Sequence, residues 1–323
     1  MLKLSEYQQY VNEYLSKLEY PETPHNLYEP IKYTMEQGGK RLRPTLVIAT
    51  CEAFGKDWKH AIYPAIGMEI FHNFTLIHDD IMDKAPIRRG VETVYKKWNP
   101  NIAILAGDTM FAIASNCMVN VDSAYIKPVV EVFNKTAIEI CEGQQLDLDF
   151  ETMENVSIDD YINMIRLKTS VFLGACMLIG ATIADADKND CNLLYDFGVN
   201  LGLAFQLRDD LLDIYSNTSV FGKINGGDIL SAKKTFVYLK ALELLGEDKK
   251  LLSDIYMSTQ IEDAKKIKKV TQIYNDLDIR SVTEKFIERY SEKAINRLQN
   301  TSLSNDNKEF FINLTNDLVK REY

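Results

Sequence analysis

The placement of proline constrains the fold of this chain most strongly. All eight prolines occur at or before Pro128, which leaves residues 129–323 without one. Because proline removes a backbone donor and clashes with the preceding helical turn, this proline-free stretch can form long helices. Apolar residues recur at three- and four-residue spacing along the whole chain, whereas the alternation typical of strands is hard to find. The sequence therefore predicts an all-α protein.

Capping and turn residues indicate where these helices begin and end. Asn99-Pro100 is typical of a cap followed by a first-turn proline, and Ser157 with Asp160 fits a capping box. Gly38-Gly39 and Gly226-Gly227 indicate breaks between helices. The predicted helices are 3–19, 25–36, 44–54, 60–83, 101–119, 127–148, 158–184, 190–215 and 229–246, with shorter ones after them. No Ser/Gly/Pro linker or fixed-period repeat divides the chain, so residues 1–323 are predicted to form a single domain.

Composition excludes several classes of protein. The net charge of −10 argues against nucleic-acid binding, because a phosphate backbone requires clustered Lys and Arg. The five cysteines are widely spaced and form no Cys-x-x-Cys, which predicts buried thiols in a reducing compartment. The chain begins without an apolar signal core, and its longest apolar run, 171–184, is too short to span a bilayer. We therefore expect a soluble, cytoplasmic protein without a transmembrane segment.

The pattern Asp-Asp-x-x-Asp occurs twice, each time inside an apolar, helix-compatible stretch. The six carboxylates are Asp79, Asp80 and Asp83 in the first copy and Asp209, Asp210 and Asp213 in the second. Residues four apart stack on one face of a helix, so each copy makes a carboxylate pair, and like charges at that spacing destabilise the helix. A positive charge is therefore expected beside them. Mg²⁺ is the natural candidate, since it binds through a few carboxylates together with waters and substrate phosphates.

Basic residues accompany these carboxylates along the chain. They are Lys40, Arg41 and Arg43 in GGKRLRP, Arg88 and Arg89 after the first copy, Lys168 in an apolar stretch, and Lys223 and Lys233 after the second copy. GGKRLRP stands at an expected helix start, where free backbone N–H groups bind anions. Either feature alone is most often a solvated helix face or an exposed turn. Together they indicate a site for a multiply charged phosphate ester with metal ions.

The order of these motifs resembles the trans-polyprenyl diphosphate synthases of the isoprenoid synthase superfamily. GGKRLRP is followed by HDDIMD with RRG, GQxxD, KT, FQxxDDxxD and a downstream GK, over residues from about Gly38 to Lys233. The resemblance implies the isoprenoid synthase fold, a bundle of long helices around a central cavity, and a homodimer. It also implies a short-chain prenyltransferase that condenses isopentenyl diphosphate with dimethylallyl, geranyl or farnesyl diphosphate by Mg²⁺-assisted ionisation.

The resemblance also implies roles for individual residues. Three Mg²⁺ ions are expected, two at Asp79 and Asp83 with Asp80 in support, and one at Asp209 with Asp210 and Asp213 around it. The allylic diphosphate is expected between the two motifs across one cavity, held also by Arg88, Lys168, Lys223 and Lys233. Isopentenyl diphosphate is expected at Lys40, Arg43, His72 and Arg89. Thr169 and Gln206 are implied to face the reacting carbons, and Gln144 and Asp147 to orient cations and water.

Product length is expected to depend on the residues one helical turn before the first motif. Phe74 and Thr75 lie five and four residues before Asp79. In the family that this chain resembles, an aromatic residue at the position of Phe74 acts as a floor for the growing tail. Phe74 beside the smaller Thr75 predicts geranylgeranyl diphosphate, with 20 carbons, as the product. Farnesyl diphosphate, with 15 carbons, is the alternative.

Three other functions compete with this interpretation. Terpene cyclases share the fold and the first motif, but FQLRDDLLD differs from their usual second metal motif. A metal phosphohydrolase with a His-Asp dyad could use His78 and Asp79, yet it would leave the second motif and GGKRLRP unexplained. A non-catalytic partner subunit of a prenyl synthase generally lacks acidic-motif residues, and here both motifs are complete.

Overall fold

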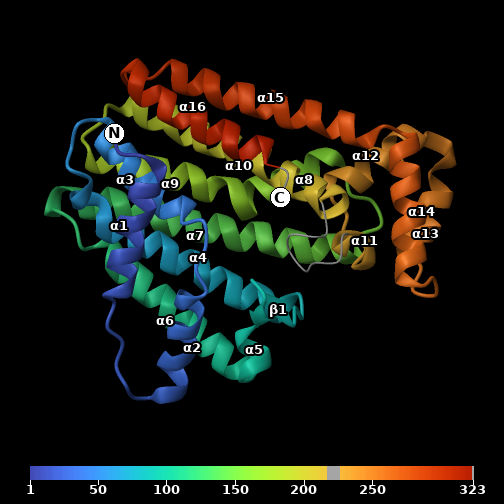
Figure 1. Ribbon diagram of the computed structural model, residues 1–323, viewed down its shortest axis with the longest axis horizontal. Coiled ribbons are helices and arrows are strands. Elements are labelled where there is room, and N and C mark those ends of the chain that lie inside the picture. The colour runs from blue at the N-terminus through green and yellow to red at the C-terminus, as the bar shows by residue number, and fades with distance from the viewer. Residues whose placement is uncertain (217–225, 322–323) are drawn as a thin grey trace. The chain divides into compact units, whose positions relative to one another are not determined.

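The structure is a computed structural model that describes residues 1–216 and 226–321. Figure 1 shows that these residues are mostly helical, which confirms the all-α prediction. The helices before residue 184 are α1 Leu4–Ser16, α2 His25–Glu36, α3 Leu42–Ala53, α4 Ile62–Met82, α5 Val94–Lys97, α6 Pro100–Met118, α7 Ser123–Thr152, α8 Ile158–Ile165 and α9 Val171–Ile183. The later ones are α10 Lys188–Tyr215, α11 Gly227–Leu230, α12 Phe236–Leu245, α13 Lys249–Met257, α14 Asp263–Asp276, α15 Ile279–Gln299 and α16 Asn305–Lys320.

The chain divides into two compact units. Unit 1 comprises Met1–Lys135 with Ala175–Leu194, and unit 2 comprises Thr136–Gly174 with Tyr195–Tyr323. The expectation of a single domain over residues 1–323 stays a prediction.

In unit 1, α4 is the central helix and packs against α3 and α6. It is apolar over most of its length, and its buried residues extend from Ile62 to Asp80. Gly67 allows α6 to come close, because a Cβ at that position would lie 2.9 Å from the carbonyl oxygen of Ala114. This packing fixes the end of α4, where the first acidic motif stands.

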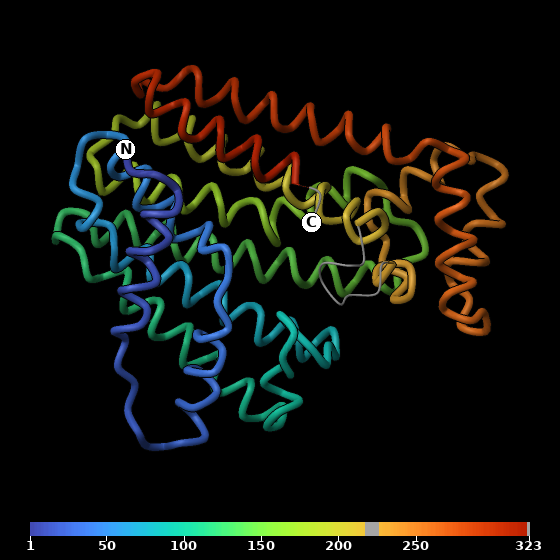
Figure 2. The backbone as a smooth tube through the Cα atoms, in the orientation of Figure 1, coloured from blue at the N-terminus to red at the C-terminus, as the bar shows by residue number. Residues whose placement is uncertain are grey.

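Unit 2 has its own apolar core, in which residues of α10, α12, α13 and α14 meet. The rings of Tyr238 and Tyr256 stack there with centroids 4.0 Å apart, and Leu207 of α10 belongs to the same cluster. The long helices α15 and α16 run side by side along this unit, as the tube in Figure 2 shows. The core therefore supports the part of α10 that carries the second acidic motif.

A π-helical turn, Arg166–Ser170, joins α8 to α9 in unit 2. The neighbouring helices α7 and α10 approach this turn closely, because each has a glycine at the contact. A Cβ on Gly143 of α7 would lie 2.3 Å from the backbone nitrogen of Lys168, and a Cβ on Gly202 of α10 would lie 2.5 Å from the Cα of Ser170. Such turns are rare and occur often at functional sites. This one carries Lys168 and Thr169.

Most predicted helix boundaries agree with the structure. The side chain of Asn99 accepts a hydrogen bond from the backbone of Ile102, and the capping box of Ser157 and Asp160 is complete. The helix predicted at 229–246 is wrong, because it is divided into α11 and α12. Ala232 adopts a left-handed conformation with φ of 52°, which ends the first helix.

The helical stretch Ile158–Ile183 is long and apolar enough to cross a membrane, but 78% of its apolar window is buried inside the protein. Burial of this kind is typical of a core helix. Strands in residues 1–216 and 226–321 are limited to the hairpin of β1 Ile87–Arg88 and β2 Val91–Glu92.

Candidate active site

The predicted site residues form one cluster in each unit. Unit 1 contains Lys40, Arg43, His72, Phe74, Thr75, Asp79, Asp80, Asp83, Arg88 and Arg89, and unit 2 contains Gln144, Asp147, Lys168, Thr169, Gln206, Asp209, Asp210, Asp213 and Lys233. Lys223 lies outside the described residues. The expectation that the two acidic motifs face each other stays a prediction.

The three carboxylates of the first motif differ in exposure. Asp79 is half-buried and Asp83 is exposed at the end of α4, whereas Asp80 is only 4% exposed. Asp80 Oδ1 accepts a hydrogen bond of 2.7 Å from Arg88 Nε. Burial raises the pKa of the Asp80 carboxyl to about 6, although Arg88 opposes that rise. Asp79 and Asp83 therefore remain accessible to a cation, while Asp80 holds an arginine.

A two-residue turn positions the two arginines that follow this motif. Arg89 and Gly90, with φ of 52° and 81°, connect β1 to β2, as a type I′ hairpin requires. Arg89 Nη1 donates to the Gly38 carbonyl at 2.5 Å and to Asn73 Oδ1 at 3.4 Å. Both acceptors are neutral. Arg89 thus connects the hairpin to the glycine pair of GGKRLRP.

The first arginine of GGKRLRP, Arg41, has a partner that the sequence analysis missed. Arg41 is buried, and its Nη1 lies 2.5 Å from Oε1 of the buried Glu69 in α4. Its Nε also donates to Asn12 in α1 at 3.0 Å. Arg41 therefore anchors this segment, whereas Lys40 is exposed and Arg43 is half-buried. The available signal for this pair was Glu69, which is the one charged residue in the first half of α4, from Ile62 to Phe71.

Arg43 and His72 approach each other in the same cluster. The distance between Arg43 Nη1 and His72 Nε2 is 3.2 Å. Burial lowers the pKa of His72 well below its ordinary value, and the nearby charges of Arg43 and Arg89 lower it further. His72 is therefore neutral at pH 7, and its Nε2 accepts the hydrogen bond from Arg43.

An aromatic cluster surrounds Phe74. Its ring centroid lies 5.4 Å from that of Phe71 and 5.6 Å from that of Phe111, and Phe111 lies 5.8 Å from Phe133. The Thr75 hydroxyl donates to the His72 carbonyl at 2.8 Å. Phe111 and Phe133 come from α6 and α7, which is why a count along α4 missed them.

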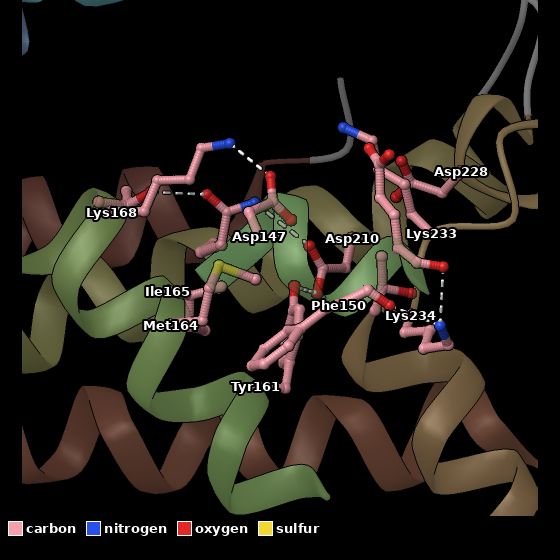
Figure 3. Close-up of a pocket in the computed structure, with 14 residues that line it drawn as sticks. Asp147, Phe150, Tyr161, Met164, Ile165, Lys168, Asp210, Asp228, Lys233 and Lys234 are labelled. Atoms are coloured by element: carbon pink, nitrogen blue, oxygen red, sulfur yellow. Dashed lines mark hydrogen bonds and ion pairs between the residues drawn. The ribbon is translucent and has the colours of Figure 1, made fainter. Parts of the chain in front are cut away.

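Part of the cluster of unit 2 lines a cavity of 130 Å³, shown in Figure 3; the predicted residues at its wall are Asp147, Lys168, Thr169, Gln206, Asp210 and Lys233. Carboxylates and lysines lie beside an apolar wall of Phe150, Met164 and Ile165. Lys168 Nζ lies 2.6 Å from Asp147 Oδ2. Lys168 and Asp147, which were predicted separately as site residues, therefore meet at this cavity.

The second motif repeats the exposure pattern of the first. The Asp209 side chain is 39% exposed and Asp213 is half-buried, whereas Asp210 is only 4% exposed. Asp210 accepts from the Tyr161 hydroxyl at 2.5 Å and from Gln206 Nε2 at 3.2 Å. Burial raises the pKa of Asp210 to about 6, against the effect of these hydrogen bonds.

Several residues of this cluster were not predicted as site residues. Asp228 donates its backbone N–H to Asp213 Oδ2 at 3.0 Å, and burial followed by the charge of Asp213 raises its pKa to about 8. Lys234 Nζ donates to the Phe150 carbonyl at 2.5 Å and so caps the end of α7. Arg321 pairs with Asp209 across 112 residues of sequence, and no local pattern indicates that contact.

The donor chemistry fits a hard cation that keeps part of its water. Among residues 1–216 and 226–321, no group of three or more His, Cys, Asp or Glu side chains could hold a metal ion by itself. Mg²⁺ needs only one or two carboxylates when substrate phosphates and waters complete its octahedron. The accessible carboxylates, Asp79 with Asp83 and Asp209 with Asp213, provide this kind of partial ligand set.

Comparison with known proteins gives a consistent result. The family model described as polyprenyl synthetase matches residues 24–276. Geranylgeranyl diphosphate synthase of Methanosarcina mazei is 40% identical over 222 residues, which are 68% of each chain. Geranylfarnesyl diphosphate synthase of Natronomonas pharaonis is 34% identical over 279 residues, covering 81% of this chain and 82% of that protein. A crystal structure of a geranylgeranyl pyrophosphate synthase superposes with a TM-score of 0.96 and 39% identity, covering 100% of both chains.

Proposed function

The chain belongs to the polyprenyl synthetase family, and from this premise we propose that it condenses isopentenyl diphosphate with allylic diphosphates to make geranylgeranyl diphosphate. The observation that carries the proposal is the shared geometry of the two acidic motifs. In both, the first and third carboxylates are accessible and the second is buried against a fixed donor. Relatives named geranylgeranyl diphosphate synthase support the 20-carbon product. Another relative is named geranylfarnesyl diphosphate synthase, so the chain length of the product needs a test of its own.

The acidic motifs are proposed to bind three Mg²⁺ ions, two at Asp79 and Asp83 and one at Asp209 with Asp213. Bound there, Mg²⁺ would offset the negative charge of the allylic diphosphate and so favour its departure. The buried Asp80 and Asp210 support the helices that present these ligands. The cations proposed to hold the allylic diphosphate are Arg88, Lys168, Lys233 and Lys223, the last of which lies outside the described residues.

Isopentenyl diphosphate is proposed to bind the basic cluster of unit 1. Lys40 is exposed, and Arg43 and Arg89 are held by contacts to His72 and to the Gly38 carbonyl. Guanidinium groups fixed in this way suit a diphosphate, because each offers several N–H donors in one plane. Neutral His72 adds an N–H donor without adding charge.

The reaction proceeds by breaking the allylic C–O bond, whose electron pair leaves with the diphosphate. The double bond of isopentenyl diphosphate then attacks the allylic cation, and a proton is lost, with the released diphosphate as the proposed base. Thr169 and Gln206 are proposed to face the reacting carbons, and Gln144 and Asp147 to orient cations and water nearby. The apolar wall of Phe150, Met164 and Ile165 limits access of water that would quench the cation.

Activity of the purified chain tests this function. We expect elongated products when it is incubated with Mg²⁺, isopentenyl diphosphate and dimethylallyl, geranyl or farnesyl diphosphate in turn, followed by chromatographic sizing. Failure with every primer would favour the non-catalytic partner subunit. Release of phosphate from nucleotides without allylic substrate would instead support a phosphohydrolase.

Product length is proposed to depend on Phe74 in its aromatic cluster, beside Thr75. Replacing Phe74 by Ala removes a ring that packs on Phe71 and Phe111, and should shift products beyond 20 carbons. Phe310→Ala, in α16, is the matched control and should leave the distribution unchanged. Unchanged products from Phe74→Ala would refute its role as a floor.

The enzyme is also proposed to form a cytoplasmic homodimer. Ile104 and Leu105 of α6 are 43% and 59% exposed, which supports an apolar contact surface. Light scattering should give a dimeric mass, and Leu105→Arg should lower it to that of a monomer. Cell fractionation tests the localisation, for which the buried helix Ile158–Ile183 is the support.

A further inference from the structure

We propose that Tyr161 is a positioning residue for the condensation, and that it acts through Asp210 and Gln206 on the Thr169 hydroxyl. This inference rests on the proposed function. Figure 3 shows Tyr161 on α8 with its hydroxyl directed at Asp210 beside the cavity. Tyr161 belongs to neither acidic motif and to none of the basic segments, so no sequence motif assigns it a role in the reaction.

The four side chains form one continuous chain of hydrogen bonds. The Tyr161 hydroxyl donates to Asp210 Oδ2 at 2.5 Å, and Gln206 Nε2 donates to Asp210 Oδ1 at 3.2 Å. The Thr169 hydroxyl donates to Gln206 Oε1 at 3.2 Å. A backbone N–H of Phe236 also donates to Asp210. Donors thus converge on both oxygens of a buried carboxylate.

This convergence sets the direction of every bond in the chain. An ionised carboxylate only accepts, so Gln206 must turn its NH₂ group toward Asp210 and its carbonyl oxygen toward Thr169. The Thr169 hydroxyl then donates its hydrogen bond to the Gln206 carbonyl. Its oxygen lone pairs remain free to face positive charge that develops on the allylic carbon in the cavity. A hydroxyl with the opposite orientation would point its proton at that charge and oppose ionisation.

The hydroxyl of Tyr161 matters to this arrangement separately from its ring. Tyr161 is 3% exposed and belongs to the apolar core of unit 2, so the ring alone accounts for packing. Without the hydroxyl, Asp210 keeps its space but loses its shortest donor. Gln206 is then less firmly oriented, because the carboxylate that holds its NH₂ group can rotate. The structure therefore separates a packing role for the ring from a directing role for the hydroxyl.

Tyr161→Phe tests the directing role. We expect kcat to fall by about tenfold to a hundredfold, as loss of one hydrogen bond to a charged group predicts, with KM for both diphosphates within about twofold of wild type. The matched control is Tyr238→Phe, which removes a hydroxyl from a tyrosine that is 2% exposed in the same core. It should keep wild-type kcat.

A double-mutant cycle with Thr169→Val identifies the route of the effect. If Tyr161 acts through Gln206 on Thr169, the double variant should be no slower than Thr169→Val alone. Multiplying losses would overturn the proposal, as would a kcat of Tyr161→Phe equal to wild type. If Tyr161→Phe does not fold, as judged by its thermal midpoint, Asp210→Asn is measured in its place and must show the same dependence on Thr169. Wild-type protein that fails to elongate any primer refutes the proposed function itself.

Discussion

The two acidic motifs share a sequence pattern and an exposure pattern, but different groups hold their buried middle carboxylates. Asp80 is bound by the guanidinium of Arg88 at 2.7 Å, whereas Asp210 accepts from a phenol and an amide. An ion pair cancels the charge of its carboxylate locally. Neutral donors orient a carboxylate and leave its charge in place. The first motif is therefore anchored by charge, and the second by the direction of hydrogen bonds.

The cations around the two motifs differ in the same sense. Unit 1 gathers arginines, including Arg43 and Arg89, while the cavity of unit 2 is lined by Lys168, Lys233 and Lys234. Guanidinium groups hold a phosphate in a fixed orientation, whereas an ammonium group is a compact charge on a flexible stem. This contrast suits the roles proposed for Arg43 and Arg89 on isopentenyl diphosphate, whose diphosphate stays attached, and for the two lysines Lys168 and Lys233 on the allylic diphosphate, which must leave.

Neutralising one accessible carboxylate in each motif should give the largest effect. Asp79→Asn and Asp209→Asn should each lower kcat by about 10²–10³-fold, since each removes a ligand for charge that stabilises the leaving diphosphate. Steady-state rates at saturating Mg²⁺ measure both. Asp196→Asn, at an exposed carboxylate of the same helix as Asp209, is the control and should change kcat little. If one of the two motif variants kept full activity, its motif would not be needed for metal binding in the reaction.

The charged anchor of the first motif should contribute more to stability than an exposed ion pair does. Arg88→Gln leaves Asp80 buried without its counter-charge, and should lower the free energy of unfolding by about 2 kcal/mol. That is less than the cost for a fully buried pair, because the Arg88 side chain is 31% exposed. Urea denaturation at pH 7 measures the change. Arg297→Gln, which breaks an exposed ion pair with Asp196, should cost well under 1 kcal/mol. Equal losses would contradict the distinction.

Sequence patterns were sufficient for the all-α fold, whereas the roles of the charged residues in both motifs stay predictions. Helical periodicity and caps such as Asn99 are local signals, so they can be read without tertiary contacts. The pairs Arg41 with Glu69 and Tyr161 with Asp210 join helices that are distant in sequence, and only the packed structure brings them together. The left-handed Ala232 is a similar case, because alanine by itself favours continuation of the helix.

Burial beside the arginines of unit 1 should make the stability of the protein sensitive to acid through His72. Burial and the charges of Arg43, Arg89, Arg88 and Arg41 lower the pKa of His72 well below 6.5. Near pH 6.5, His72 therefore becomes protonated in the unfolded chain but stays neutral in the folded chain. The free energy of unfolding consequently falls as the pH drops through that value. Acidification from pH 7 to 5.5 should cost the wild type up to about 1 kcal/mol more than His72→Gln. Urea titrations at both pH values measure this difference, and parallel losses would argue that His72 is protonated in the folded protein.

Arg321 provides the smallest and most specific test of the comparison, because it gives the second motif a charged partner at its first carboxylate. Its guanidinium pairs with Asp209 and lies 4.2 Å from the ring of Phe205. A cation held there competes with Mg²⁺ for the same oxygen. Arg321→Gln should therefore lower the Mg²⁺ concentration for half-maximal rate by about two- to fivefold, as expected for a partly exposed ion pair.

Direct Mg²⁺ binding by calorimetry should shift in the same direction as the rate, which separates affinity from turnover. Lys320→Gln, at the exposed neighbouring position, is the control for a change in net charge and should leave both values unchanged. An unchanged or weaker affinity in Arg321→Gln would mean that Arg321 positions Asp209 for the metal and does not compete with it. In that case both acidic motifs would rely on an arginine as an anchor, and the contrast between charged and neutral anchoring would apply only to the buried middle carboxylates.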